Sequence, residues 1–299
     1  MKTGNSILPF GRLRDILLDV YNEKDKLWLA TWFVGIGALW LWDAAFLHRP
    51  VFDRLQTAFV NTLFTGISVV LFSLILGWSL GVTLYFMEKA SNRIPYLVLT
   101  FALNLIRSIP QIVGILIGYV VITIAIETET FRNQYYQLIS MAIVISVFVF
   151  LEVVDLIRER VSHYKKLDFF PAMLCCGIKE GRIINIEILW KNSMTHLVHK
   201  LISIFGITIF LQCSIDFILS VGLFTDVSSS NFPVTLGSLL AKMDSKQDVL
   251  AIGTVFSGSA YFKDLFVQHL QGISVAFAIV FSLLCIYQIS NGFVKRLDS

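Results

Sequence analysis

The stretch FVNTLFTGISVVLFSLILGWSLGVTLYF, from Phe59 to Phe86, contains no Asp, Glu, Lys or Arg. A helix needs roughly 20 mainly apolar residues to cross the hydrocarbon of a bilayer, and this stretch is long enough to do so. A membrane β-barrel would instead need short segments in which apolar and polar residues alternate. Because a helix satisfies its own backbone hydrogen bonds in lipid, the stretch predicts a membrane-spanning helix.

The rest of the chain repeats this pattern. The full 299 residues are 56% hydrophobic and only 15% charged, against roughly 25% charged in soluble domains. We therefore predict an all-α, polytopic membrane bundle of about six transmembrane helices. Arg107 and Pro110 interrupt the third span, so its membrane portion is expected to begin near Ile109 and the helix to kink at the proline. The six predicted spans are Leu27–Leu47, Phe59–Phe86, Leu97–Ile126, Tyr135–Ile157, Leu201–Leu223 and Gly272–Val294.

The positive charges predict how these spans are oriented. With both termini inside, 17 of the 24 Lys and Arg residues lie on the cytoplasmic side and six on the outer side, as positive-inside topology requires. Residues 1–26 are then a cytoplasmic segment, without the early apolar core of a cleaved signal, and 27–299 a transmembrane domain. This domain contains a basic cytoplasmic loop, 158–200, and an outer loop, 224–271, with a short helix expected from Leu236 to Met243. The net charge of +3 reflects this orientation and excludes nucleic acid as a partner.

The cytoplasmic loop predicts two short helices that meet at a glycine. The first is expected from Asp168 to Cys176, and the second begins near Arg182 after the break Gly177–Gly181. Glycine permits a sharp change of direction without a Cβ clash. Small residues on the first helix would seat against a soluble partner, and Lys179, Glu180 and Arg182 would make charged contacts at its rim. Ile183, Ile184, Ile186 and Ile188 would bury against the spans. The alternative is an amphipathic linker that lies on the lipid.

The same loop resembles the signature of permease subunits of binding-protein-dependent ATP-binding-cassette importers. That signature runs E-A-A-x-x-x-G and ends, nine residues after the glycine, in I-x-L-P. Ala172, Gly177 and Leu189 match it, whereas Pro171 and Trp190 stand at its acidic and final proline places. Further segments are similar to the dipeptide, oligopeptide and nickel branch of the family, in the same order along the chain: Asn104 with Ser108–Pro110, Arg182–Ile184, Ile188–Trp190, Gln212–Phe217, Leu236–Ala241 and Ile289–Asp298.

The resemblance implies a type I permease fold in the bacterial cytoplasmic (inner) membrane. It implies a second homologous permease, two cytoplasmic ATP-binding-cassette ATPases that bind ATP and Mg²⁺, and an extracytoplasmic solute-binding protein as partners, with membrane lipid around them. The ATPase-coupling residues would be Pro171, Ala172, Met173, Cys176, Gly177, Ile178, Lys179, Glu180 and Arg182. The chain has no G-x-x-x-x-G-K-[ST] loop, so we expect no catalytic residues and no cofactor of its own.

Polar residues within the spans are candidates for a translocation pathway: Asn104, Arg107, Pro110, Gln212 and Asp216. Asp216 is taken as the deepest formal charge, and an ionisable group inside a membrane defaults to a functional hypothesis. It either faces a water-filled path beside Gln212 and Ser220, or is hydrated or paired near the outer end. Arg107 either lines an inner gate or, preferably, reaches lipid headgroups.

Two polar clusters near the span ends have plainer interpretations. Glu152 and Asp155 are expected to form an interfacial cluster of ion pairs with Arg158 and Arg160. Nearby histidines at the start of the fifth span, His196 and His199, are expected to be surface anchors, because no carboxylate or cysteine accompanies them in a metal-ligand pattern. No metal site is expected.

These patterns favour a permease subunit of an ATP-driven transporter that imports short peptides or a related small solute. An exporter of the same family, for example of polyamines, is the nearest alternative. A stand-alone secondary transporter or channel is the alternative of another class, although it predicts paired intramembrane carboxylates or inverted repeats of broken helices.

Overall fold

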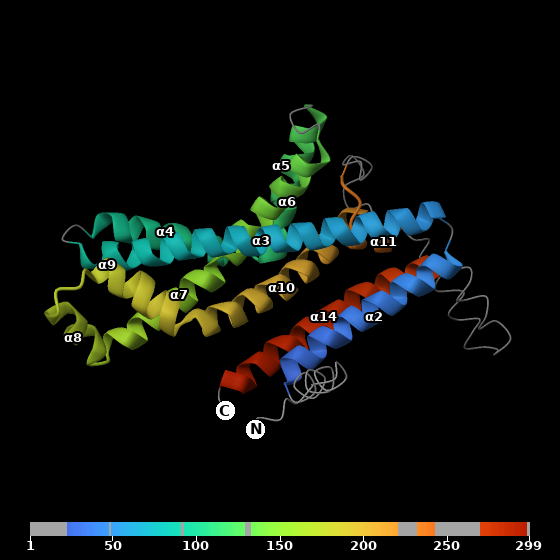
Figure 1. The fold of residues 1–299 in the computed structure, drawn as a ribbon. Helices are drawn as coiled ribbons and strands as arrows, with labels where there is room; N and C mark the ends of the chain where they lie inside the picture. The colour runs from blue at the N-terminus through green and yellow to red at the C-terminus, as the bar shows by residue number, and fades with distance from the viewer. Residues whose placement is uncertain are drawn as a thin grey trace, which may run out of the picture.

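The computed structural model describes residues 23–47, 49–90, 93–128, 133–220, 232–242 and 270–297 (Figure 1). Four helices are long and apolar enough to cross a membrane, and two bent helix pairs raise the number to six if each pair is one span. The four are α2 (Lys24–Phe46), α3 (Arg49–Lys89), α10 (Met194–Ser220) and α14 (Leu270–Leu297). The described ranges contain no β-strand. The predicted all-helical class is therefore confirmed. The segment before Glu23, predicted to be cytoplasmic, and most of the predicted outer loop 224–271 lie outside the described residues.

The distribution of side chains is that of a membrane-embedded protein. Large apolar residues are exposed on the outer faces of the helices, among them Val34 and Phe101. Polar residues such as Thr65, Ser73 and Gln212 are buried between helices. A soluble monomer rarely exposes so much contiguous apolar surface.

The third predicted span is broken rather than kinked. It forms α4 (Ile94–Ser108) and α5 (Gln111–Glu127), which meet at 95°. Ile109 is extended, with φ −84° and ψ 126°, because the proline ring disfavours helical geometry in the residue before it. The prediction of a kink at Pro110 was right about the position but wrong about the extent, and α4 lies against the carboxyl-terminal part of α3 (Figure 1).

The fourth predicted span also consists of two helices, which the sequence did not predict. These are α6 (Gln134–Val149) and α7 (Leu151–Lys165), at 43° to each other. The bend at Phe150 lies where α3 passes closely. A Cβ on Gly77 would lie 2.4 Å from Val153 Cβ and 3.1 Å from the Phe150 carbonyl oxygen. A Cβ on Gly81 would lie 2.9 Å from Ile157 Cγ2, so this pair of glycines lets side chains of α7 pack directly on the backbone of α3.

After α7 the chain forms three short helical segments. These are α8 (Phe169–Cys175), α9 (Glu180–Arg182) and the π-helix η1 (Ile183–Asn192). The two predicted helices are present, but the break between them is shorter than expected because α9 already begins at Glu180. The π-helical winding was not predicted, since i→i+5 hydrogen bonding leaves no simple pattern in a sequence.

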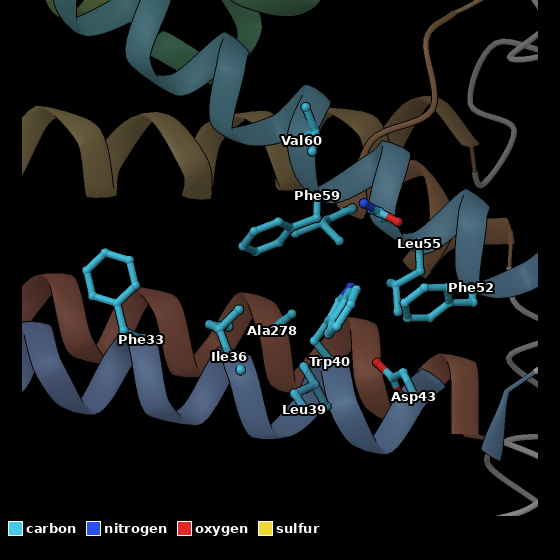
Figure 2. A pocket seen from close by; sticks show the side chains of 13 residues that line it. Phe33, Ile36, Leu39, Trp40, Asp43, Phe52, Leu55, Phe59, Val60 and Ala278 are labelled. Atoms are coloured by element: carbon cyan, nitrogen blue, oxygen red, sulfur yellow. The ribbon is translucent and has the colours of Figure 1, made fainter. Parts of the chain in front are cut away.

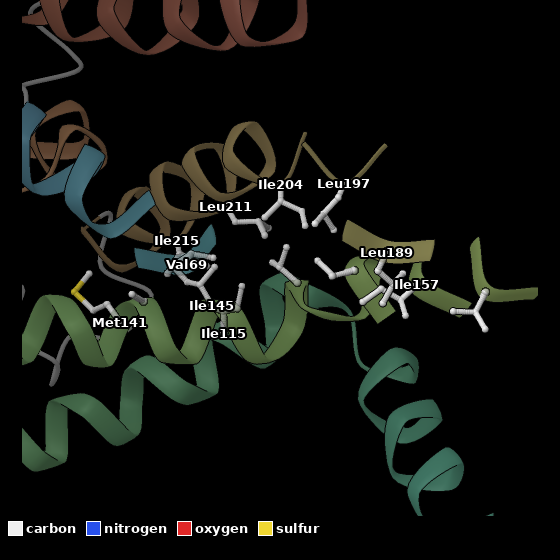
Figure 3. Packing of buried hydrophobic residues seen from close by; sticks show 14 of the residues in the cluster. Val69, Ile115, Met141, Ile145, Ile157, Leu189, Leu197, Ile204, Leu211 and Ile215 are labelled. Carbon is white, nitrogen blue, oxygen red and sulfur yellow. The ribbon is translucent and has the colours of Figure 1, made fainter. Parts of the chain in front are cut away.

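One large apolar cluster joins α3, α5, α6, α7, α10 and η1 (Figure 3). Val69, Ile145 and Ile204 are fully buried in it. Ile183, Ile184 and Ile188 of η1 are buried in the same cluster, as predicted. Ile186 is not, because 42% of it remains exposed. The prediction assigned all four isoleucines to the buried side, whereas Ile186 falls on the opposite side of the helix from the other three.

Two further elements complete the bundle. Helices α2 and α14 lie side by side along most of their length (Figure 1). The short helix α11 (Leu236–Lys242) packs against α3, α10 and α14, with Leu236 and Leu239 buried. This confirms the helix predicted from Leu236, while Met243 at its predicted end lies outside the described residues. Asn61 Nδ2 donates to the Val234 carbonyl at 2.8 Å, so α3 also holds the chain just before α11.

Candidate functional site

The turn between α8 and α9 depends on the backbone of Gly177. Its φ of +77° is in the left-handed region that favours glycine. The Gly177 N–H donates to the Leu174 carbonyl at 2.9 Å, and the Ile178 N–H donates to the Met173 carbonyl at 3.2 Å. This pair of bonds is a Schellman cap, which satisfies carbonyl groups at the end of α8 and reverses the chain.

The outer face of this turn is open. Phe170 is buried and anchors α8 to the apolar cluster, and Met173 and Ile178 pack partly against it. Six of the predicted coupling residues are exposed: Pro171, Ala172, Cys176, Gly177, Lys179 and Arg182. Small and apolar side chains therefore cover a protruding surface, and no other element of the described structure buries it.

Glu180 differs from these residues, because its side chain is only 18% exposed and bonds to α3. The predicted contact of Glu180 with a partner at the rim stays a prediction. The Glu180 carboxylate accepts hydrogen bonds from Tyr85 Oη and Lys89 Nζ of α3, each at 2.5 Å. Partial burial opposes its ionisation, but these two hydrogen bonds and the charges of Lys89 and Lys165 outweigh it and hold the pKa of Glu180 below its ordinary value.

A second contact fastens η1 to the same helix. Trp78 Nε1 of α3 donates to Asn185 Oδ1 of η1 at 2.9 Å. Beside these contacts, α3 and α7 enclose a polar cleft of about 440 Å³ lined by Tyr85, Glu88, Arg158 and Lys165. Movement of the α8–η1 turn must therefore involve α3. We call this region the Gly177 end of the bundle.

The structure places the predicted pathway residues in two separate regions. Asn104, Arg107 and Pro110 are exposed in and after α4, close to the Gly177 end. Arg107 Nη2 contacts both carboxylate oxygens of Asp155, at 2.7 and 2.8 Å. Because both side chains are about half exposed, this ion pair contributes little to stability. The gate or headgroup contact of Arg107 stays a prediction.

The predicted ion-pair cluster on α7 exists with other partners. Asp155 pairs with Arg107, and Glu152 pairs with Lys200 Nζ at 2.7 Å. Arg160 instead donates to Ser193 Oγ at 3.3 Å and lies over the ring of Tyr164. The prediction paired residues that are neighbours in sequence, whereas the bent α7 brings these carboxylates to helices from other parts of the chain.

Gln212 and Asp216 lie one turn apart on α10, at the other end of the bundle. Asp216 is 6% exposed and accepts a hydrogen bond from Thr235 Oγ1 at 2.5 Å. The Leu236 N–H donates to Thr62 Oγ1 of α3 at 3.0 Å, which ties this region to α3. Thr62 and Tyr85 are about 35 Å apart along α3 at 1.5 Å per residue. We call the region around Asp216, Thr235 and Thr62 the Asp216 end.

Two residues of this region were not predicted from the sequence. Thr235 immediately precedes α11 and bonds to Asp216 across 19 positions of the chain. Tyr119 of α5 is 1% exposed, and its ring stacks on Phe232 with centroids 5.8 Å apart. A tyrosine within an otherwise apolar run was the only available signal. The side chain of Ser220, expected beside Asp216, lies outside the described residues.

Asp43 is a further buried acid that was not predicted from the sequence. It is 1% exposed, less than Asp216, and accepts a hydrogen bond from Ser274 Oγ at 2.5 Å. Exposure within the protein does not measure depth in the bilayer, so the prediction that Asp216 is the deepest charge in the membrane stays a prediction. Asp43 lies at one end of an apolar groove of about 380 Å³ between α2, α3 and α14, with Trp40, Phe52 and Phe59 on its walls (Figure 2).

Among the described residues no group of three or more His, Cys, Asp or Glu could hold a metal ion. His199 Nδ1 lies 2.9 Å from Ser290 Oγ, a contact between α10 and α14. No model of a known protein family matches the chain, and a search of curated proteins found no match.

Proposed function

We propose that this chain is a membrane-spanning subunit of an ATP-driven transporter and that its α8–Gly177–η1 turn is the docking site for a cytoplasmic ATPase. The observation that carries the proposal is a protruding turn whose outer face is open while its inner face is fastened to a long membrane helix. The partial likeness to the signature of ATP-binding-cassette permeases lies in the same residues. Both features favour a site where a soluble protein presses on the membrane helices.

The exposed composition of the turn suits such docking. Pro171, Ala172 and Cys176 are small enough to allow a close approach to a partner's surface, and Lys179 and Arg182 are exposed at its edge. Interfaces combine an apolar centre with a polar rim in this way. The partner ATPases would bind ATP and Mg²⁺, and this chain would supply the surface on which they act.

The contacts on the inner face provide a route for mechanical coupling. Glu180 and Asn185 bind Tyr85, Lys89 and Trp78 of α3, and Gly77 and Gly81 hold α3 against α7. A displacement of the turn by nucleotide-driven closure of the ATPases would therefore move α3 as a rigid body. Transport requires two packings of the helices with different affinities for the nucleotide-bound ATPase.

The proposed complex would lie in the cytoplasmic membrane, with a second homologous permease and a solute-binding protein on the outer side. Its cargo would be a short peptide or a related small solute. The few polar side chains in the spans suit a pathway that leaves most selectivity to the binding protein.

Purification of the full chain from its native membrane in mild detergent tests the proposal. The expected result is co-purification of ATP-hydrolysing subunits, which Ala172→Arg should reduce about tenfold by placing a charge in the docking face. Gln134→Arg, at an exposed position at the start of α6, is the matched control and should leave the yield unchanged. Absence of any ATPase with the unaltered chain would contradict the proposal.

A further inference from the structure

Two polar side chains at the Asp216 end, Gln212 and Tyr119, have three hydrogen-bonding atoms without a partner in the described part of the chain. Gln212 is 0% exposed, and neither amide atom has a partner within the described part of the chain. Tyr119 is 1% exposed, and its hydroxyl is likewise without a partner among those residues. A buried polar group without a hydrogen bond costs about 1–3 kcal/mol, so such groups usually mark an unseen water or ligand.

These two side chains and the buried Asp216 belong to one region. Gln212 and Asp216 share a face of α10 because they are four residues apart. Tyr119 stacks on Phe232, three residues before Thr235, and Thr235 donates to Asp216 Oδ2. Tyr119 and Ile215, which immediately precedes Asp216, belong to the same buried cluster. Helices α5 and α10 and the segment before α11 thus converge here.

The charge of this region is unbalanced. Asp216 takes part in none of the salt bridges found among the described residues, and its hydrogen bond comes from a neutral hydroxyl. A carboxylate buried in a membrane protein normally has a cationic companion. The region also offers three oxygen acceptors, from a carboxylate, an amide and a phenol.

We infer that Asp216, Gln212 and Tyr119 form a binding site for a primary ammonium group of the transported solute. An ammonium group has three N–H donors and one positive charge, which match three acceptors and one carboxylate. Thr235 positions the carboxylate, and Phe232 holds the Tyr119 ring. That the solute is transported rests on the proposed function, whereas the cation site rests on these side chains alone.

Thiol labelling of the purified full chain in detergent tests the site. In a background with the four native cysteines replaced, Gln212→Cys and Tyr119→Cys are each treated with 2-aminoethyl and with 2-sulfonatoethyl methanethiosulfonate. After correction for their reactivity with a free thiol, the cationic reagent should react about tenfold faster or more, because the carboxylate attracts it and repels the anion. Adding Asp216→Asn should bring the ratio close to one.

The matched control is Ile115→Cys, one turn before Tyr119 on α5 and fully buried in the apolar cluster. It should react with neither reagent. At equal ionic strength, ethylammonium chloride should slow labelling of the Gln212→Cys variant more than sodium chloride does, which separates an ammonium site from a site for inorganic cations.

Three outcomes would overturn the inference: equal rates for the two reagents, no labelling in variants that elute as the unaltered chain does, or equal protection by sodium. None of these measurements requires an ATPase. Failure of the ammonium site is therefore distinguishable from failure of the proposed function, which the co-purification experiment tests separately.

Discussion

At the scale of single residues, Gly177 combines a restricted backbone with free space. Its φ of +77° favours glycine, but nothing lies within 4 Å of the position that a Cβ would occupy. A substitution there is therefore opposed by conformation and not by a clash. The left-handed conformation costs about 1–2 kcal/mol for an ordinary residue and less for asparagine.

We predict that Gly177→Val disturbs the turn and uncouples the ATPase, whereas Gly177→Asn retains most activity. Insertion into the membrane should be normal in both variants, because the substitution lies outside the spans. Transport-coupled ATP hydrolysis by the purified complex measures the difference. Equal activity of the valine and asparagine variants would show that the left-handed turn is dispensable.

Gly237 presents the opposite case, in which space and not conformation is limiting. A Cβ there would lie 2.7 Å from Cys213 Cα and 2.9 Å from the Cys213 carbonyl oxygen. Because backbone atoms cannot move aside cheaply, Gly237→Ala should destabilise the protein by about 1–3 kcal/mol. Thermal unfolding in detergent checks this value. Gly37→Ala, with nothing within 4 Å, should be neutral or slightly stabilising, as alanine is in a helix.

The functional residues differ in how far the sequence could predict them. Gly177 was predictable because a glycine between two short amphipathic segments indicates a turn from the local sequence alone. Asp43 and Tyr119 were not, because their burial depends on distant parts of the chain. Asp43 bonds to Ser274, 231 positions away, and Tyr119 stacks on Phe232. Only the packing of α2 on α14 and of α5 against the segment before α11 creates these environments.

At the scale of elements, the join between the α8–η1 turn and α3 depends on the ionised form of Glu180. Its pKa is lowered in the folded protein, since the hydrogen bonds from Lys89 and Tyr85 outweigh the effect of burial. The stabilisation is therefore present above the ordinary pKa of a glutamate. It is lost as the pH falls through the lower folded-state value.

We predict that lowering the pH from about 7 to about 3 reduces the unfolding temperature of Glu180→Gln less than that of the unaltered chain. The glutamine variant should be less stable at neutral pH and approach the unaltered chain in acid. Because all other carboxylates titrate in both proteins, the difference between the two curves isolates Glu180. Parallel curves would show that the contact with α3 contributes no pH-dependent stability.

Breaks between elements were predictable only where a residue type enforces them. Pro110 marks the break between α4 and α5 because it lacks an N–H and restricts Ile109. The bend at Phe150 has no such residue beside it and arises from close contact with Gly77 of α3. The π-helical winding of η1 was not predicted, and the prediction that all four isoleucines are buried overlooked that Ile186 faces away from the other three.

At the scale of the whole molecule, the four cysteines can be used to determine which end of the bundle faces the cytoplasm. Cys175 and Cys176 are exposed at the Gly177 end, and Cys213 and Cys285 are buried. If that end faces the cytoplasm, a membrane-impermeant maleimide should label two thiols per chain in inverted vesicles and none in intact cells. Replacing Cys175 and Cys176 with serine should abolish the labelling. Labelling in intact cells would reverse the predicted topology.

The architecture as a whole was predictable from apolar length, because long apolar runs must become helices in lipid. The arrangement of those helices was not. Only tertiary contacts decide that α4 lies along α3, that α2 pairs with α14, and that α11 inserts between α3, α10 and α14. The predicted pathway residues were consequently divided between the two ends of the bundle.

The unbroken length of α3 has a mechanical consequence. Its 41 residues form one stiff rod, and Gly77, where it presses on α7, can serve as a fulcrum. The arm from Gly77 to Tyr85 is about 12 Å, and the arm from Gly77 to Thr62 is about 22 Å. A push on the short arm would swing the long arm in the opposite direction through nearly twice the distance, as a lever does.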